Sequence, residues 1–211
     1  MQLELRTFTI RPHTVSLFQP KDEDVQKNYI QNKESENVVK PYWAKIWPAS
    51  LAMSQFLVKY PNYIKGKTVV ELAAGLGLPT LIASKYANEI CCSDYLPEAV
   101  EVIKKSVEYN SITNVECKVL NWHYLPETLK PEVLLMSDVN YEPDEFNVLY
   151  KVFMQFLNTG TTIILSTPQR LIAKPFIEKL LPWVIEQEEF KIEETYTTVM
   201  VLRGANLKFK I

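Results

Sequence analysis

Short apolar runs alternate with amphipathic stretches along most of this 211-residue chain. From residue 67 onward, runs rich in β-branched residues precede stretches whose apolar positions recur every three or four residues, which predicts strands alternating with helices. The expected strands are residues 68–72, 90–94, 115–120, 132–138 and 161–166. The expected helices are residues 48–60, 78–86, 97–109, 143–157 and 171–186. This order predicts a parallel sheet covered by helices and joined by right-handed crossovers.

The two ends of the chain depart from this alternation. Residues 190–197 and 198–202 are β-rich stretches with no helix between them, and they predict a C-terminal antiparallel hairpin. At the other end, residues 5–17 alternate like a strand. Residues 21–37 are polar and fit either a helix or a mobile loop.

These patterns predict a single domain of the α/β class over residues 1–211. The expected architecture is Rossmann-like: a mostly parallel sheet with helices on both faces and the antiparallel hairpin at its C-terminal end. Residues 1–40 are expected to form an extension or lid, and residues 41–211 the core. A chain of this length is long enough to bury a complete hydrophobic core.

Charge and hydropathy narrow the class of protein. The net charge of −2 leaves no overall basic field for nucleic acid. No apolar run approaches the roughly 20 residues of a membrane span, and the first ten residues lack a signal-peptide pattern. We therefore expect a cytoplasmic protein without a membrane or nucleic-acid partner.

The three cysteines are Cys91, Cys92 and Cys117, and all of them fall within expected buried strands. None has the C-x-x-C spacing of a zinc or redox site. Because free cysteine packs as a small apolar residue, we expect reduced thiols in the core and neither a disulfide nor a metal site.

The most informative segment is residues 69–77, Val-Val-Glu-Leu-Ala-Ala-Gly-Leu-Gly. A β-branched strand carries an acid near its end, Glu71, and then breaks into a turn of small residues before a helix. Such a turn lets backbone amides approach a ligand closely. The combination predicts a nucleotide site.

The kind of nucleotide follows from the acids. The spacing Glu71-x-Ala73-x-Gly75-x-Gly77 is not the G-x-G-x-x-G of pyrophosphate cofactors. A carboxylate at this turn would repel a diphosphate, but it suits the ammonium and sulfonium charges of S-adenosylmethionine. Asp94 ends the next expected strand, where such units grip a ribose diol. An ordinary turn with a solvated acid is the simpler alternative, and the pair of acids weighs against it.

An aromatic segment precedes the core, with Tyr42, Trp43 and Trp47 in a short turn bounded by prolines. Buried packing is a strong alternative for tryptophan. The turn leads into the first helix beside the sheet, and this position favours a place near the mouth of the cofactor site.

Together these segments resemble the class I, seven-β-strand S-adenosylmethionine-dependent methyltransferases, and within them the family-16-like group of protein lysine methyltransferases. The resemblance covers nearly the whole chain from residue 40 onward, and Asp138-x-x-Tyr141 is similar to the D-x-x-Y/F motif of that group. The matching segments are residues 43–50, 69–79, 91–95, 120–122 and 137–142.

Two residues depart from the pattern of the group. Ala73 replaces the first glycine of the usual E/D-x-G-x-G-x-G, which a turn tolerates if φ is negative there. Asn121 stands where the group often has an aspartate, and its carbonyl oxygen can still accept a hydrogen bond from the adenine amino group.

The resemblance implies roles for particular residues in a cofactor-binding core. Glu71 would contact the amino-acid end of S-adenosylmethionine, Asp94 its ribose and Tyr95 its adenine face. The implied cofactor-binding residues are Trp47, Glu71, Ala73, Gly75, Gly77, Asp94, Tyr95, Asn121, Trp122 and Asp138, and the expected substrate-binding residues include Trp43 and Tyr141. Arg170 lies in the loop after the fifth expected strand, on the ligand side of the sheet, where substrate binding and a plain surface position are equal alternatives.

Asp138 and Tyr141 are the catalytic candidates because they follow the fourth strand of the core, whose carboxyl end faces the cofactor. A carboxylate beside an aromatic ring can position a lysine amine by hydrogen bonding and cation–π attraction. The alternative is that Asp138 caps a turn and Tyr141 only packs. His13 and His123 are expected to be structural or surface residues and not catalytic, and His123, which follows Trp122, lies nearer the cofactor.

Three functions therefore compete. The first is a protein N-methyltransferase acting on lysine. The second uses the same cofactor on a small amine, a heteroaromatic nitrogen or an RNA base, and the lack of a basic stretch weighs against RNA. The third is a binding module without catalysis, against which the intact turn and Asp94 argue. The identity of the acceptor stays open at this stage.

Overall fold

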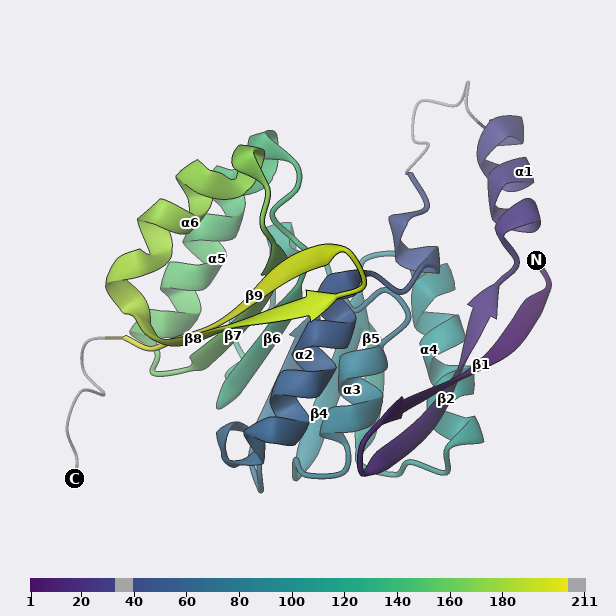
Figure 1. Ribbon diagram of the computed structural model, residues 1–211, viewed down its shortest axis with the longest axis horizontal. Helices are drawn as coiled ribbons and strands as arrows, with labels where there is room; N and C mark the ends of the chain where they lie inside the picture. The colour runs from purple at the N-terminus through teal and green to yellow at the C-terminus, as the bar shows by residue number, and fades with distance from the viewer. Residues whose placement is uncertain (33–39, 205–211) are drawn as a thin grey trace.

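The computed structural model describes residues 1–32 and 40–204, and seven of its strands form one sheet (Figure 1). The order is β5-β4-β3-β6-β7-β9-β8, in which β9 runs antiparallel to both of its neighbours and the other pairs are parallel. The predicted mostly parallel sheet with a C-terminal hairpin is therefore confirmed. The bounds are β3 (Thr68–Leu72), β4 (Glu89–Asp94), β5 (Val115–Val119), β6 (Val133–Ser137), β7 (Thr162–Pro168), β8 (Val184–Ile192) and β9 (Thr195–Leu202).

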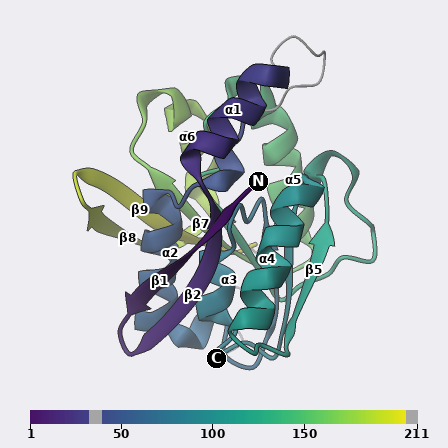
Figure 2. The same cartoon turned by 90° about the vertical axis from the view of Figure 1, so that its right-hand side faces the viewer.

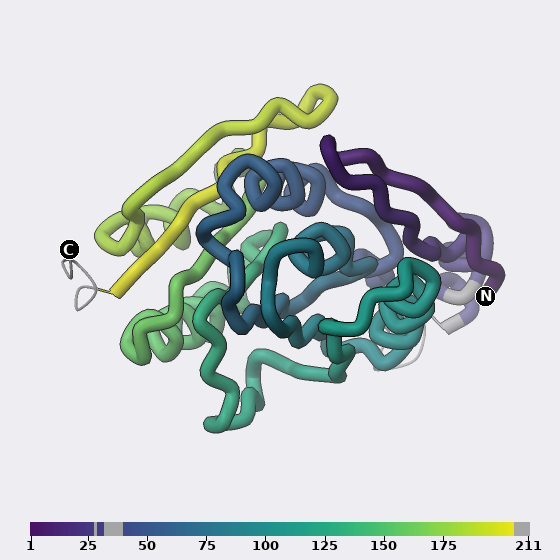
Figure 3. Tube along the Cα trace, turned by 90° about the horizontal axis from the view of Figure 1, so that it is seen from below, coloured from purple at the N-terminus to yellow at the C-terminus, as the bar shows by residue number. Residues whose placement is uncertain are grey.

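Helices cover both faces of this sheet and create two hydrophobic cores (Figures 1 and 3). Side chains of a strand alternate between the faces, so Leu135 of β6 joins the first core whereas Leu134 and Met136 join the second. The first core lies under α2 (Pro48–Lys59), α3 (Leu78–Ala83) and α4 (Pro97–Tyr109), and the second under α5 (Phe146–Asn158) and α6 (Lys174–Leu180).

The N-terminal segment begins with a separate two-stranded sheet, β1 (Leu3–Ile10) and β2 (His13–Pro20), followed by α1 (Asp22–Asn32). The hairpin packs on α3 and α4 (Figure 2). Asn110 fixes it, because its amide Oδ1 accepts from the Ser16 N–H at 3.1 Å and its Nδ2 donates to the Ser16 carbonyl at 2.5 Å. The expected single strand over residues 5–17 is thus two strands, and the end of the expected 21–37 segment lies outside the described residues.

The structure corrects three expectations, about a helix, a turn and the cysteines. The expected helix over residues 171–186 is broken into short 3₁₀ turns around α6, and the chain is already extended from residue 184. The turn of the hairpin falls at Glu193 and Glu194 and not at residue 197. Cys92 is buried as expected, whereas Cys91 and Cys117 are half-exposed. All three thiols are free.

The strand order indicates which edge of the sheet binds a ligand. From β3 the chain moves outward to β4 and β5, and then returns to the other side of β3 to form β6 and β7. Ligands of open α/β sheets bind at the carboxyl ends of the strands near such a reversal. Within residues 1–32 and 40–204, no helix combines the length and apolar character needed to cross a bilayer.

Candidate functional site

A cavity of about 340 Å³ lies at the carboxyl ends of β3, β4 and β6, a volume typical of small-ligand sites. Its lining includes most of the residues that the sequence singled out, namely Trp43, Trp47, Ala73, Gly75, Asp94, Tyr95, Trp122, Asp138, Tyr141 and Arg170. Three predicted residues do not line it: Glu71, Gly77 and Asn121.

The turn after β3 forms the floor of this cavity and runs through left-handed backbone conformations. Ala73 has φ 54°, Gly75 has φ 58° and Gly77 has φ 72°, so the condition of a negative φ, under which alanine fits this turn without strain, is not met. A Cβ on Gly75 would lie 3.2 Å from the Trp43 carbonyl oxygen, and a Cβ on Gly77 would press on Ile103. Gly75 therefore allows the aromatic turn to pack closely, and Gly77 allows α3 to pack on α4.

Glu71 is buried beneath α3 and not exposed in the cavity. Successive residues of β3 face opposite sides of the sheet, and Glu71 shares the face of Val69, which belongs to the first core. Thr80 Oγ1 donates a hydrogen bond to Glu71 Oε2 at 2.5 Å. Burial raises the pKa of Glu71 to about 8. The Glu71 side chain therefore faces Thr80 and does not line the cavity.

Asp94 closes the turn from the neighbouring strand. Its Oδ2 accepts from the Gly75 N–H at 3.0 Å, and its Oδ1 accepts from the Leu96 N–H at 3.1 Å. The side chain is buried, and this burial raises the pKa of Asp94 while the backbone donors oppose the rise. Each carboxylate oxygen keeps acceptor capacity for a further hydrogen bond. Tyr95 follows at the rim and is half-exposed, and burial of its hydroxyl raises its pKa to about 12.

Trp122 lines the cavity from the 3₁₀ turn Trp122–Tyr124, which Asn121 caps by accepting from the His123 N–H at 2.9 Å. This cap is made by Asn121 Oδ1, the oxygen that was expected to accept a hydrogen bond from the adenine amino group.

Glu145 is a residue of this region that was not predicted from the sequence. Its Oε2 accepts from Trp122 Nε1 at 2.9 Å and lies 2.9 Å from His123 Nε2. Nothing in the local sequence links residues 122 and 145, because folding alone brings them together.

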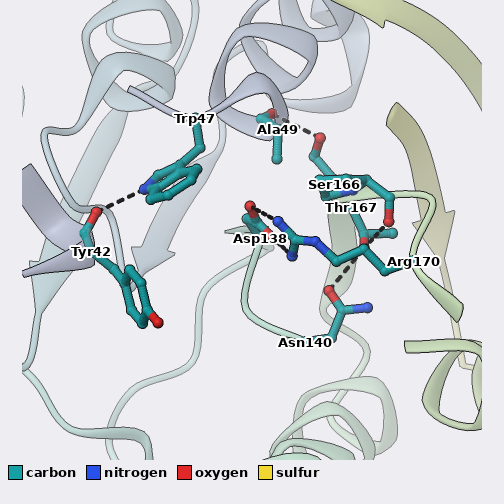
Figure 4. A network of polar contacts seen from close by, with 9 residues as sticks. Tyr42, Trp47, Ala49, Asp138, Asn140, Ser166, Thr167 and Arg170 are labelled. Carbon is teal, nitrogen blue, oxygen red and sulfur yellow. Dashed lines mark hydrogen bonds and ion pairs between the residues drawn. The ribbon is translucent and has the colours of Figure 1, made fainter. Parts of the chain in front are cut away.

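Aromatic side chains form one wall of the cavity (Figure 4). The Trp47 Nε1–H donates to the Tyr42 carbonyl at 2.7 Å, and the rings of these two residues are in edge contact with centroids 6.1 Å apart. The Tyr42 ring also meets the Tyr141 ring at 5.3 Å. The aromatic turn therefore lies at the cavity mouth. Two lysines of the lining, Lys40 and Lys45, flank this turn in the sequence and could have been predicted from that position.

Asp138 and Arg170 form a bidentate ion pair in the cavity (Figure 4). Arg170 Nη2 donates to Asp138 Oδ2 at 2.9 Å, and Nη1 donates to Oδ1. The backbone of Asp138 is left-handed, with φ 54°, and its N–H donates to the Ser166 carbonyl at 2.8 Å. The sequence predicted both residues at the site but not their pairing, because they lie in different loops.

The loops that carry this pair are held by buried hydrogen bonds (Figure 4). Ser166 Oγ donates to the Ala49 carbonyl, and Thr167 Oγ1 donates to Asn140 Oδ1. Ser137 Oγ lines the same cavity, is buried and has no hydrogen-bond partner in the protein. An unpartnered buried hydroxyl beside the cavity fits a polar ligand such as S-adenosylmethionine. Among the described residues, no three His, Cys, Asp or Glu side chains form a group that could hold a metal ion.

Known proteins identify the class and then the family. The structure resembles the N-methyltransferase NodS from Bradyrhizobium japonicum in complex with S-adenosyl-L-homocysteine, with a TM-score of 0.64 and 8% identity over 86% of this chain and 98% of NodS. At this identity the likeness establishes the fold alone. The sequence profile of the lysine methyltransferase family matches residues 26–182. The chain belongs to this family, whose members use S-adenosylmethionine as methyl donor.

Two human relatives show the range of acceptors named within this group. The histone-arginine methyltransferase METTL23 is 28% identical over 64% of this chain and 75% of its own length. The electron transfer flavoprotein beta subunit lysine methyltransferase is 29% identical over 62% of this chain and 50% of its own length. The matched segment thus spans between half and three quarters of these relatives.

Proposed function

We propose that this protein transfers a methyl group from S-adenosylmethionine to the side-chain amine of a lysine in an acceptor protein. The observation that carries the proposal is the position of Asp138 and Tyr141 in the cavity, beside an aromatic wall and across from Asp94. The family supports a lysine acceptor, and the electron transfer flavoprotein relative is named for one.

The cofactor would be held by residues of the turn and its neighbours. Asp94 would accept hydrogen bonds from the ribose hydroxyls, and Trp122 and Tyr95 would lie beside the adenine. Ser137 Oγ is available as a further hydrogen-bonding group. Bound S-adenosylmethionine supplies a methyl group that its sulfonium already activates for transfer.

The protein must then bring a neutral amine into line with that methyl group. Tyr42, Trp47 and Tyr141 offer ring surfaces along which the aliphatic part of a lysine side chain can pack. A carboxylate has about four lone-pair sites, and Arg170 uses two of those on Asp138. Asp138 can therefore still accept an N–H of the acceptor amine and orient its lone pair. Water can take the proton that the amine loses.

The test is incubation of the purified protein with labelled S-adenosylmethionine in a lysate of the source cells, followed by residue analysis. Label in methyllysine supports the proposal, whereas label confined to RNA or small molecules contradicts it.

Asp138→Asn should reduce transfer at least tenfold while the affinity for S-adenosylhomocysteine changes little. Tyr141→Phe should lose less activity than Tyr141→Ala, because phenylalanine keeps the aromatic wall. Full activity per folded molecule in Asp138→Asn would rule out the role given to this residue.

A further inference from the structure

Neither carboxylate in the described lining of the cavity lacks a hydrogen-bond partner. Its described lining holds two carboxylates, Asp94 and Asp138. Asp94 accepts two backbone N–H groups, and Asp138 is paired through both oxygens with the guanidinium of Arg170. The other charged or titratable groups that face the cavity are Lys40, Lys45 and the tyrosines Tyr42, Tyr95 and Tyr141.

Cations outnumber carboxylates in the described lining of the cavity, and Glu142 is close enough to act on the lining residues Tyr95 and Tyr141 by its charge. Lys40, Lys45 and Arg170 are three cations against two carboxylates. Lys45 is partly compensated by Asp22 at 3.8 Å, and Lys40 lies 5.8 Å from the Tyr42 ring centroid. Arg170, unlike these two lysines, is fixed directly on the carboxylate that faces the acceptor amine in the proposed reaction.

We propose that Arg170 determines acceptor specificity by neutralising Asp138, so that the cavity admits the neutral amine of lysine and rejects the permanently charged guanidinium of arginine. The inference rests on the proposed lysine methylation and adds the residue that enforces it. Arg170 acts through Asp138 and is a positioning residue.

Arginine and lysine differ in charge and in geometry as partners for the Asp138–Arg170 pair. An arginine side chain stays protonated in proteins and needs a free carboxylate in bidentate geometry for a strong contact. Arg170 already occupies that position on Asp138 with the same group. A lysine ammonium can lose its proton, and a positive neighbour lowers its pKa. Of the two side chains, lysine is therefore the one that can become uncharged beside the Asp138–Arg170 pair.

The test compares wild type with Arg170→Gln, which frees Asp138, and with Arg170→Lys, which keeps the charge but not the planar fork. Lys174→Gln is the matched control, because this lysine is exposed on α6, does not line the cavity and carries the same charge.

At pH 7 Arg170→Gln should lower kcat for lysine about tenfold without raising KM. Raising the pH should restore kcat, with the profile displaced upward by about one unit. Arg170→Lys should keep a profile close to that of wild type. A purely structural role of Arg170 would lower the melting temperature and leave the profile in place.

A binding measurement does not depend on finding the acceptor. The protein saturated with S-adenosylhomocysteine is titrated with n-butylamine and with n-butylguanidine. Wild type and Lys174→Gln should bind butylamine more tightly as the pH rises and should show no detectable binding of butylguanidine. Arg170→Gln should bind butylguanidine with a Kd at least tenfold below the detection limit that applies to wild type.

The outcomes separate the two proposals. Absence of label from protein in the lysate overturns the proposed function alone, since the probe titrations still report on Arg170. Binding of butylguanidine by wild type, methylarginine formed by wild type, or an unchanged pH profile and probe preference in Arg170→Gln overturns the specificity role.

Discussion

Ala73 carries backbone strain at the centre of the cofactor turn. Its φ of 54° lies in the left-handed region, which costs a residue with a Cβ roughly 1–2 kcal/mol. Its neighbour Ala74 does not share this conformation, and the Ala74 N–H donates to the Ser93 carbonyl at 2.9 Å. The two alanines thus offer a matched comparison within a single turn.

We expect Ala73→Gly to stabilise the protein by up to about 1 kcal/mol, because the relief of strain exceeds the extra entropy of glycine in the unfolded chain. Ala74→Gly should destabilise it by about 0.5–1 kcal/mol or more, since the entropic cost and the loss of a methyl group packed on the first core apply there without any relief of strain. Urea unfolding of both variants measures the difference. Equal destabilisation by the two substitutions would show that the left-handed turn carries no strain at Ala73.

The buried carboxyl of Glu71 makes stability depend on pH. Its pKa is about 8 in the folded protein and near 4.5 when the chain is unfolded. The folded state therefore binds more protons between these values. The contribution of Glu71 to the free energy of unfolding is full below about pH 4.5. It falls between pH 4.5 and 8, by at most about 1.4 kcal/mol per pH unit, and does not change further at higher pH.

Glu71→Gln should remove this dependence, because an amide resembles the protonated carboxyl in size and stays neutral. The unfolding free energy of the variant should match that of wild type near pH 5 and exceed it by a few kcal/mol at pH 8. Unfolding curves at four pH values test this. Glu127→Gln serves as the control because Glu127 is exposed. Parallel pH profiles for wild type and Glu71→Gln would contradict the assignment.

At the level of elements, the N-terminal segment consists of two parts with different attachment. The β1–β2 hairpin buries Ile10, Val15 and Leu17 in the first core and is fixed by hydrogen bonds to α4. Among the described side chains of α1, only Val25 is buried. The exposed Asp22 forms an ion pair at 3.8 Å with Lys45 of the cavity lining. The hairpin thus belongs to the core, whereas α1 lies close to the site with few anchoring contacts.

We expect amide exchange in the hairpin to be slow with and without ligand, and exchange in α1 to slow when S-adenosylhomocysteine and acceptor bind. Hydrogen-exchange mass spectrometry measures both segments in one sample. Asn110→Ala provides the control, because it should speed exchange in the hairpin and leave α1 unchanged. Equal protection of α1 in both states would make it a fixed layer and not part of a lid.

The sequence predicted the regular elements well where one physical signal dominated. The helix over Pro97–Tyr109 has its bounds correct because apolar spacing and Pro97 agree. The helix expected to reach residue 186 failed because glutamates favour helices locally, while pairing with β9 holds residues 184–192 extended. Local patterns cannot report such tertiary pairing.

The same limit applies to the site. Acids at strand ends and the small-residue turn located the cavity, since strand ends converge in a parallel sheet. The burial of Glu71, the cap made by Asn121 and the pairing of Asp138 with Arg170 depend on side-chain direction and on loops far apart in sequence. Those features required the structure.

At the scale of the whole molecule, the cavity joins the two halves of the sheet. Asp94 ends β4 on one side of β3, whereas Asp138 follows β6 and Arg170 follows β7 on the other side. A ligand that contacts both sides opposes the separation of these segments on unfolding. Cofactor binding should therefore stabilise the fold as a unit and not only one loop.

Cofactor binding should therefore raise the melting temperature Tm of the whole protein. S-adenosylhomocysteine at about 100 times its Kd should stabilise the protein by about 2.7 kcal/mol and raise Tm by about 5–10 °C for a chain of this size. NAD should give no shift, because the turn lacks the glycine pattern of a pyrophosphate site. Asp94→Asn loses charge-assisted hydrogen bonds of about 1.5–3 kcal/mol, so at the same ligand concentration its shift should fall to between about a half and a tenth of the wild-type shift. Its own Tm will also fall, since Asp94 holds Gly75 and Leu96, and the ligand-induced shift is therefore the quantity to compare. Asp144→Asn, at an exposed carboxylate outside the cavity lining, should keep the full shift; an equal shift in Asp94→Asn would remove Asp94 from the cofactor site.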